Sequence, residues 1–293
     1  MGADTIVLYP VDKVPRSAFI EGLNTAYRDY YVPIAMTPAT FAEFVARESV
    51  LLSASAAALD GERVVGMGML GVRGLRGWIG GMGVHPDCRR QGIGRRLMHY
   101  LLDRARDLGL AQIQLEVIVQ NRAAYQLYCS LGFETRRRLL VLQRDESPFL
   151  PLPVEAVLSV EPCPPSELLA SLAHLQAVLR PWQREQATLE HILDRLEGLA
   201  AYAPEGEVIG VCLFSVDTRR VGLFDLAAVD GAVGRDMLGH LYAKHPHASS
   251  GYVNVPQDDP MLAALWDVGF RESLSQYEMI YSLTPGTLEP DQE

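Results

Sequence analysis

The sequence predicts an α/β fold of the α+β type, in which a mixed central sheet flanked by helices occurs twice, as two domains. Three observations predict it. In the first half, hairpin signals precede a strand–loop–helix–strand unit, which implies antiparallel strands followed by two parallel neighbours. The second half repeats this order of elements. The 293 residues suffice for about two domains, each with a core of its own.

The first half begins with a predicted strand and two predicted helices. Residues 5–10 are typical of a strand, and the helical spacing of apolar residues predicts a helix that carries Phe19 and Tyr27. Thr37 followed by Pro38 is typical of a helix start, because threonine is a good N-cap and proline is tolerated in the first turn. We therefore expect two helices before the main strands of the sheet.

A hairpin is predicted next. Residues 53–59 and 63–70 are strand-like and flank Asp60-Gly61, a dipeptide that favours a tight turn. The strand that follows, at residues 77–84, contains four glycines. Glycine inside a strand often marks a place where a ligand or another backbone comes close.

The loop after this strand has the features of an anion-binding site. Residues 89–94 connect the strand to a helix that is predicted to end before Gly109. Gly92 and Gly94 allow the backbone N–H groups to turn inward, and the first turn of the helix adds unpaired donors and partial positive charge. The spacing is that of neither the Walker loop nor the three-glycine dinucleotide fingerprint.

Two motifs resemble the GNAT superfamily of N-acetyltransferases. The first is Arg89-x-x-Gly92-x-Gly94, which is similar to the acetyl-CoA loop of that superfamily. The second runs from Asn121 to Phe133 and reads Asn-x-x-Ala-x-x-x-Tyr-x-x-x-Gly-Phe. The resemblance is specific over residues 78–142 and loose over residues 5–77, and it implies the GNAT fold and acetyl-CoA as the acyl donor, with no metal.

The resemblance implies which residues bind acetyl-CoA. The pantetheine arm would pair with the backbone of the glycine-rich strand, the phosphates would lie on the loop and the following helix start, and the asparagine would bind the arm while capping its helix. The expected cofactor-binding residues are Met82, Gly83, Val84, Arg89, Arg90, Gln91, Gly92, Ile93, Gly94, Arg95 and Asn121.

Two side chains are expected to carry the catalysis. Tyr128 matches the tyrosine that protonates the departing thiolate in the family, and its spacing turns it toward the sheet. Glu116 lies on the polar face of the strand 112–119 and resembles the base of the bacterial ribosomal-protein N-terminal acetyltransferases. A plain structural role stays open for both. The resemblance also puts the tyrosines of residues 27–31 over the acceptor cleft, where ordinary packing is the alternative.

The second half keeps the order of elements and loses the chemistry. We expect a catalytic domain at residues 1–145, a proline-rich linker at 146–165, and a degenerate GNAT-like domain at 166–293. Residues 229–234 lack the arginine of the loop, and Asp230 would repel phosphate. Leu265 stands in place of the tyrosine, and Val253 in place of the glutamate. We expect this half to act as a scaffold.

Composition limits the partners and the compartment. The net charge of −10 combines a basic first half with an acidic second half and disfavours nucleic acid as a partner. The four cysteines show no Cys-x-x-Cys pair, which argues against structural zinc or a disulfide framework and favours the cytoplasm. We expect neither a signal peptide nor a membrane-spanning segment, so no membrane partner; a homodimer stays open.

The expected function is acetyl-CoA-dependent N-acetylation of a primary amine, which in our interpretation belongs to a small molecule. The attack would be direct, with general acid and base help. Two alternatives stay open. One is a protein N-terminal acetyltransferase, and the other is a non-catalytic acyl-CoA-binding sensor or interaction protein.

Overall fold

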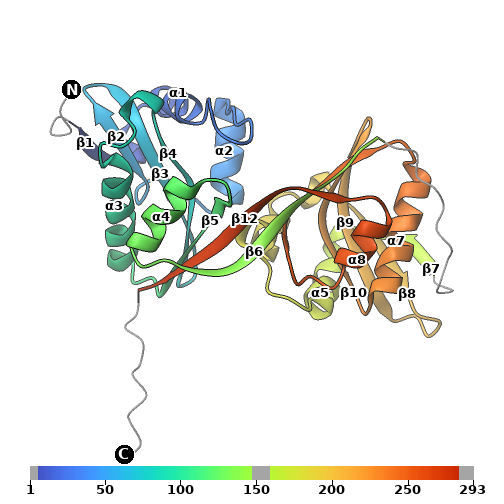
Figure 1. Cartoon of the computed structure of the whole chain (residues 1–293). Coiled ribbons are helices and arrows are strands. Elements are labelled where there is room, and N and C mark those ends of the chain that lie inside the picture. Colours follow the sequence, from blue (N-terminus) through green and yellow to red (C-terminus); the bar gives the residue numbers. More distant parts are fainter. Residues whose placement is uncertain (1–5, 147–158, 284–293) are drawn as a thin grey trace, which may run out of the picture. The chain divides into compact units, whose positions relative to one another are not determined.

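The computed structural model describes residues 6–146 and 159–283, which form two compact units (Figure 1). Unit 1 contains residues up to Arg136 together with those from Tyr277 onward, and unit 2 contains Arg137–Gln276. Each unit has a sheet covered by helices, as the sequence predicts for a duplicated α+β fold. None of the helices in the described ranges is both long and apolar enough to cross a membrane.

The strands of unit 1 follow the chain across most of its sheet. They are β1 (Val7–Pro10), β2 (Ala56–Asp60), β3 (Arg63–Arg73), β4 (Arg76–Val84) and β5 (Gln112–Ile118). The first four pair antiparallel in this order, and β4 pairs parallel with β5. The predicted hairpin at Asp60-Gly61 and the parallel crossover are thus confirmed. Gly61 has a φ of 60°, the conformation that this tight turn requires.

The helices of unit 1 pack on two apolar surfaces. The helices α1 (Arg16–Ala26) and α2 (Pro38–Arg47) share one core, with Phe19 and Phe41 fully buried. The helices α3 (Ile93–Asp107) and α4 (Arg122–Ser130) share the other, together with apolar residues of β5. Thr37 caps α2 as predicted, because its hydroxyl accepts a hydrogen bond from the N–H of Thr40. Two short 3₁₀ turns, η2 (Val11–Lys13) and η3 (Pro86–Cys88), complete this part of the chain.

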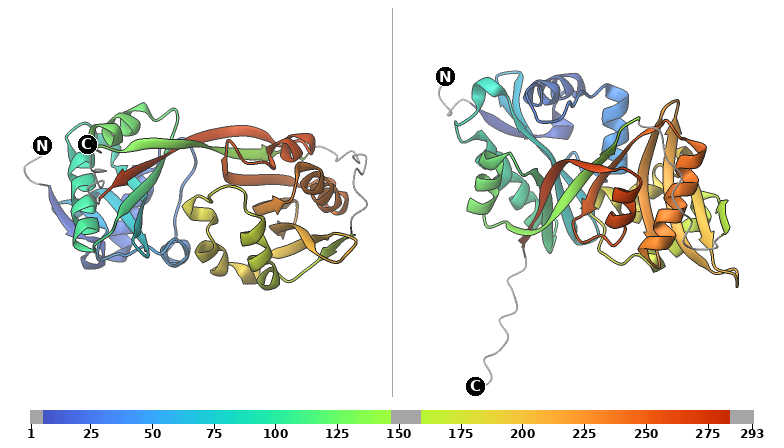
Figure 2. Two further views of the ribbon diagram at one scale, coloured as in Figure 1. Left: turned by 90° about the horizontal axis from the view of Figure 1, so that it is seen from below. Right: turned by 45° about the vertical axis from the view of Figure 1, so that its right-hand side comes forward.

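Two long strands, β6 and β12, each run from one unit into the other. The strand β6 (Glu134–Arg144) leaves unit 1 at residue 136 and pairs antiparallel with β11 in unit 2. The strand β12 (Arg271–Ser282) returns to unit 1 at residue 277, where it follows β5 in the strand order. Figures 1 and 2 show β6 and β12 side by side.

The exchange changes the division of the chain. The contacts separate the units at residues 136 and 276, whereas we expected domain boundaries at residues 145 and 166. The order of elements repeats as predicted, but the last strand of each half continues from its own unit into the other one. Residues 147–158, which form most of the expected linker, lie outside the described residues.

Unit 2 repeats the plan of unit 1. Its other strands are β7 (Ser159–Pro162), β8 (Glu197–Tyr202), β9 (Val208–Asp217), β10 (Arg220–Ala228) and β11 (Ser249–Pro256). Its helical elements are α5 (Pro165–Leu175), η4 (Trp182–Arg184), α6 (Gln186–Glu190), η5 (Leu193–Arg195), α7 (Gly231–Lys244) and α8 (Leu262–Asp267).

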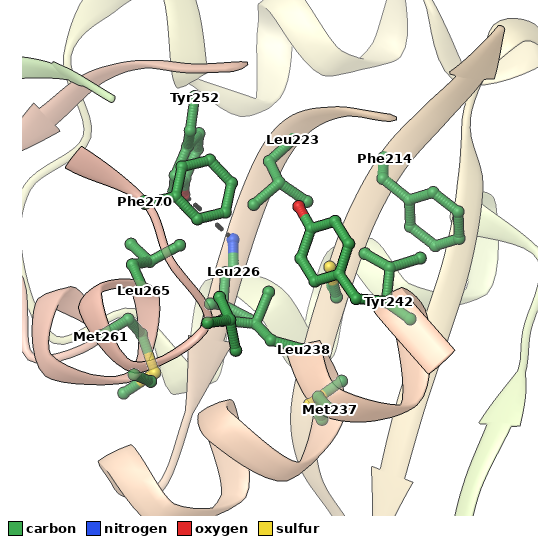
Figure 3. Close-up of a cluster of buried hydrophobic side chains, with 14 of the residues drawn as sticks. Phe214, Leu223, Leu226, Met237, Leu238, Tyr242, Tyr252, Met261, Leu265 and Phe270 are labelled. Carbon is green, nitrogen blue, oxygen red and sulfur yellow. Dashed lines mark hydrogen bonds between the residues drawn. The ribbon is translucent and has the colours of Figure 1, made fainter. Parts of the chain in front are cut away.

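The core of unit 2 lies between its sheet and the helices α7 and α8. Figure 3 shows Tyr242 and Leu238 of α7 beside Leu223 of β10, with Phe270 and Tyr252 on the other side. The Leu226 N–H donates a hydrogen bond of 3.1 Å to the hydroxyl of Tyr252. This bond ties β10 to β11 beyond their last paired residues.

Candidate functional site

The candidate site of unit 1 begins where β4 and β5 separate. Their parallel register runs from Arg76 opposite Gln112 to Ile79 opposite Leu115 and ends there. The pairing of β4 with β3 becomes irregular beyond this point, and Gly81 has a φ of 74°. An irregularity of this kind bends a strand and turns it from its neighbour. We call the space between the diverging ends of β4 and β5 the unit 1 splay.

The loop after β4 leads to an open helix N-terminus. Gly92 is the N-cap of α3 with a φ of 79°, and no side chain caps this end. A Cβ at Gly92 would meet nothing within 4 Å, so the space beside this backbone is open. Arg90 also has a positive φ, of 64°. The N–H groups of residues 91–95 therefore fit an anionic phosphate group.

The side chain of Arg89, an expected cofactor ligand, is bound within the chain in this structure. It donates to both carboxylate oxygens of Asp29, at 2.6 and 2.7 Å, and to the backbone carbonyls of Ala26 and Val84. This hydrogen bond foremost lowers the pKa of Asp29. Arg89 thus fastens the segment after α1 to the end of β4.

Ile93 and Arg95 lie in the first turn of α3, at the expected phosphate site, and Asn121 lies at the start of α4. Arg95 donates to the hydroxyl of Ser130 at 2.8 Å, and Ile93 is buried in the core of α3. The carboxamide of Asn121 caps α4, where the N–H of Ala124 donates to it at 3.3 Å. Within the described residues, no group of three or more histidine, cysteine, aspartate or glutamate side chains is arranged to hold a metal.

Glu116 lies at the start of the splay and is held by a tryptophan. The indole N–H of Trp78 donates a hydrogen bond of 2.7 Å to its Oε2. Trp78 packs against Phe44 of α2, with ring centroids 6.1 Å apart, so this pair lies on the α1/α2 side of the sheet. Sequence reasoning missed Trp78. Its position in the strand was visible, but its partner depends on the register between β4 and β5.

Tyr128 lies on the other side of the sheet and is 6% exposed. Its ring packs in the core shared by α3 and α4, with the ring of Phe133 at 6.0 Å. Burial foremost, and Tyr30 in addition, raise the pKa of its hydroxyl above the ordinary value. The hydroxyl therefore stays protonated at neutral pH.

Three tyrosines after α1 lie between the two diverging strands. The hydroxyl of Tyr27 donates to the carbonyl of Met82 at 3.1 Å, and that of Tyr31 donates to the carbonyl of Gln120 at 3.2 Å. The ring of Tyr30 stands edge-on to the ring of Tyr27, 5.0 Å away. Burial raises the pKa of both Tyr27 and Tyr30, and Tyr128 raises that of Tyr27 further. The structure therefore brings Tyr128 close to these tyrosines across the splay.

Unit 2 has a splay at the equivalent place. The parallel register of β10 and β11 runs from Arg220 opposite Ser249 to Leu223 opposite Tyr252 and ends there. The helix that follows β10 is capped by its own carboxylate, because the N–H of Val233 donates to Asp230 at 2.9 Å. This helix start is thus occupied by a negative charge of the chain itself.

Charged side chains fill this second splay. Arg180 and Arg184 place guanidinium nitrogens 2.8 and 2.7 Å from the same oxygen of Asp225, and Arg180 also reaches Asp259 at 3.4 Å. All four are at most 6% exposed. We call these four residues the buried ion cluster. No sequence signal pointed to it, because its members come from three separate parts of the chain.

The comparisons with known proteins agree with this geometry. Residues 17–133 match the sequence profile of the acetyltransferase (GNAT) family. The [ribosomal protein bS18]-alanine N-acetyltransferase of Escherichia coli (strain K12) is 50% identical over 50 residues, which are 17% of this chain and 34% of that protein. The mycothiol acetyltransferase of Thermobifida fusca (strain YX) is 49% identical over 53 residues, 18% of this chain and 16% of that protein. The chain thus spans about a third or less of these relatives.

Whole-chain likeness is found among solved structures. A tandem GNAT protein from the clavulanic acid biosynthesis pathway superposes with a TM-score of 0.71 at 17% identity, over 96% of this chain and 99% of the other. A GCN5-related N-acetyltransferase from Sphaerobacter thermophilus superposes with a TM-score of 0.71 at 15% identity, over 98% of each chain. At these identities the likeness shows the fold alone.

Proposed function

From the match of residues 17–133 to the acetyltransferase (GNAT) family we propose that unit 1 belongs to this family and transfers an acetyl group from acetyl-CoA to a primary amine of a small molecule. One observation carries the proposal. An uncapped helix N-terminus, a held carboxylate at Glu116 and a protonated phenol at Tyr128 all adjoin the splay between β4 and β5. At the splay of unit 2 the helix start is capped by Asp230, and Val253 and Leu265 stand where Glu116 and Tyr128 do in unit 1.

The loop and the strand end would hold acetyl-CoA, which supplies a thioester activated toward amines. The N–H groups of residues 91–95 would take its phosphates, and the backbone of Met82, Gly83 and Val84 would take its pantetheine arm. A glycine N-cap at 92 keeps the helix start open. These groups orient the donor, and such orientation is a large source of rate.

Glu116 and Tyr128 would move the protons. The carboxylate of Glu116 would accept the proton that the ammonium group must lose before it attacks, directly or through water. The hydroxyl of Tyr128 holds a proton that the leaving sulfur can take up. Because burial raises the pKa of this hydroxyl, the proton is present throughout the neutral range.

The segment after α1 supports a small acceptor. Tyr27 and Tyr31 connect the ends of both diverging strands, so the access to the splay is narrow on this side. The relatives that are similar to this chain include an L-amino acid N-acyltransferase of Escherichia coli (strain K12) and the mycothiol acetyltransferase, whose names state small substrates. A protein N-terminus is the second candidate, favoured by the 50% identity to the bS18-alanine enzyme.

A thiol-release assay with acetyl-CoA tests the proposal. One panel contains amino acids, amino sugars and polyamines, and the other contains peptides with different N-terminal residues. We expect turnover with a member of the first panel. Turnover with peptides alone would establish the second candidate, and tight acetyl-CoA binding with no turnover in either panel would indicate a sensor.

The compartment and the assembly are part of the proposal. All four cysteines are free thiols, which is typical of a reducing compartment, and we propose the cytoplasm. A homodimer would be compatible with this function. Light scattering on the purified chain decides between monomer and dimer.

A further inference from the structure

We propose that Trp78 is a positioning residue that holds the carboxylate of Glu116 in its ionised form and in one orientation. The inference rests on the proposed function, because it gives Glu116 a partner for the role of base. Trp78 itself does not touch the reacting atoms in this proposal.

The register of the sheet sets the pair. Trp78 lies opposite Gln114 in the parallel pairing of β4 with β5, so Glu116 is two residues further along on the same face. The indole N–H spans this offset and reaches Oε2 at 2.7 Å. A donor held at this distance favours the charged form of a carboxylate over the neutral form.

The indole has little freedom to turn away. Its ring lies over Gly80, where a Cβ would stand 2.0 to 2.5 Å from three ring atoms. Phe44 closes the other side at 6.1 Å, and Trp78 is only 5% exposed. Glycine at 80 is therefore required by the indole, because any side chain there would displace the ring.

Unit 2 has lost both members of the pair. By register, Gly222 stands where Trp78 does, and Val253 stands where Glu116 does. Phe224 takes the place of Gly80, so there is no room for an indole in the same position. If Trp78 only packed in the sheet, its presence would not depend on that of Glu116. The absence of both residues from unit 2 is expected if the two act as a pair.

The tyrosines near the pair stay neutral in the working range. Tyr27 and Tyr30 after α1 and Tyr128 of α4 have raised pKa values and remain neutral below pH 10. The charged groups on the elements packed against this face include Arg16 and Glu21 of α1, Glu43 and Arg47 of α2, Arg76 of β4, and the ion pair of Asp29 with Arg89. The pH dependence of the pair is thus carried by Glu116.

A spectroscopic test needs neither acetyl-CoA nor an acceptor. The indole ¹H–¹⁵N signals of Trp78 and Trp266 are assigned from the variants Trp78→Phe and Trp266→Phe and recorded at pH 7. We expect the Trp78 proton to lie downfield in the wild type and to move upfield in Glu116→Gln, because a neutral acceptor is weaker. The Trp266 signal should stay in place. An unchanged Trp78 signal would overturn the inference.

A kinetic test compares pH profiles of kcat/KM for the wild type, Trp78→Phe and the control Trp266→Phe. Phenylalanine keeps an aromatic ring and removes only the donor. We expect its acidic limb to move about one unit to higher pH, the order expected for losing one charge-assisted hydrogen bond, so that activity on this limb falls about tenfold. Trp266→Phe should follow the wild type.

The outcomes separate the two claims. A Trp78→Phe profile parallel to that of the wild type, in a variant with an unchanged urea midpoint, would overturn the positioning role. Wild-type activity in Glu116→Gln would instead remove Glu116 as the base and so contradict the proposed function, whereas the indole signal would still report on the pair.

Discussion

The two splays of this chain share one backbone plan and differ in what fills them. In each, two parallel strands pair over four residues and then diverge. Backbone carbonyls and neutral tyrosines line the splay of unit 1, beside an uncapped helix start. The splay of unit 2 holds the buried ion cluster, beside a helix start capped by Asp230. A GNAT-like splay can therefore be closed by side chains of its own chain.

The charges in unit 2 pair with one another. Burial lowers the pKa of Arg184, but Asp225, Tyr252 and Asp259 outweigh it, so that the pKa is raised and the guanidinium stays charged. The hydroxyl of Tyr252 donates to Asp225 at 3.2 Å, and the N–H of Leu226 donates to the same oxygen at 2.8 Å. A ligand at this place would have to replace all of these bonds.

The largest expected effect comes from removing β12. The side chain of Met279 is fully buried in unit 1, the ring of Tyr281 packs on that of Phe133 at 5.3 Å, and the N–H of Leu283 donates to Ala111 at 2.8 Å. We expect a chain that ends at Phe270 to lose the cooperative unfolding of unit 1. Its sheet would lack a strand, and its core would lack the side chains that β12 contributes. Urea unfolding followed by circular dichroism measures this.

A chain that ends at Leu283 is the control for the truncation and should unfold as the full chain does. If the shorter chain kept the full cooperative transition and bound acetyl-CoA, β12 would not be part of the fold of unit 1. The two units would then be separable, and the exchange of strands would not contribute to the free energy of unfolding of unit 1.

The next effect is on the buried ion cluster. We expect Asp225→Ala to destabilise unit 2 by about 3–5 kcal/mol, because two buried guanidinium groups would lose their shared partner. Asp230→Ala, which removes only a helix cap, should cost about 1 kcal/mol. The urea midpoints of the two variants and the wild type give both values. A cost for Asp225→Ala no greater than that of the cap would show that the cluster is not what closes this splay.

Tyr128→Phe tests the acid in unit 1. The ring packing is kept, so we expect unchanged acetyl-CoA affinity and a turnover that is about 100-fold slower, the lower end of the range for losing a general acid. The wild type should show no loss of activity from this hydroxyl as the pH passes about 10, the ordinary tyrosine value, because burial raises the pKa of Tyr128 above it. Phenylalanine with full turnover would reduce Tyr128 to a core residue.

The smallest expected effect comes from giving α3 of unit 1 the N-cap residue that α7 has in unit 2. Gly92→Asp places a carboxylate at the N-cap of α3, as Asp230 does for α7. We expect acetyl-CoA to bind about 10- to 100-fold more weakly, because the carboxylate takes the donors and repels phosphate. Gly92→Asn is the control, since it accepts the left-handed conformation without adding charge and should lose less affinity.

Calorimetry on the wild type sharpens this prediction. We expect one acetyl-CoA per chain, bound in unit 1. A stoichiometry of two would show that the buried ion cluster opens for a ligand. The splay of unit 2 would then be a binding site that is closed in this structure and not one that its own side chains block permanently.

Features of unit 1 that depend on local sequence could be predicted. The turn at Asp60-Gly61, the cap at Thr37 and the helix start at Gly92 each follow from a few neighbouring residues. The parallel pairing followed from the length of the crossover. The position of Asn121 as the cap of α4 is again a local property.

Features that depend on register or on distant segments could not be predicted. The hydrogen bond from Trp78 to Glu116 joins residues 38 apart in the sequence and needs the exact pairing of two strands. Arg89 has the type and position of a phosphate ligand, yet Asp29, 60 residues earlier, binds its side chain. The exchange of β6 and β12 leaves the order of elements unchanged, so a repeat in the sequence does not reveal it.

The position of β12 also affects how the chain is made. During synthesis the ribosome delivers the residues of β5 long before residues 277–282, so most of unit 2 emerges before unit 1 can close its sheet. Until then the edge of β5 is exposed, and domains that fold in order of emergence avoid such a delay. A chain released before residues 277–282 are made therefore lacks a finished unit 1.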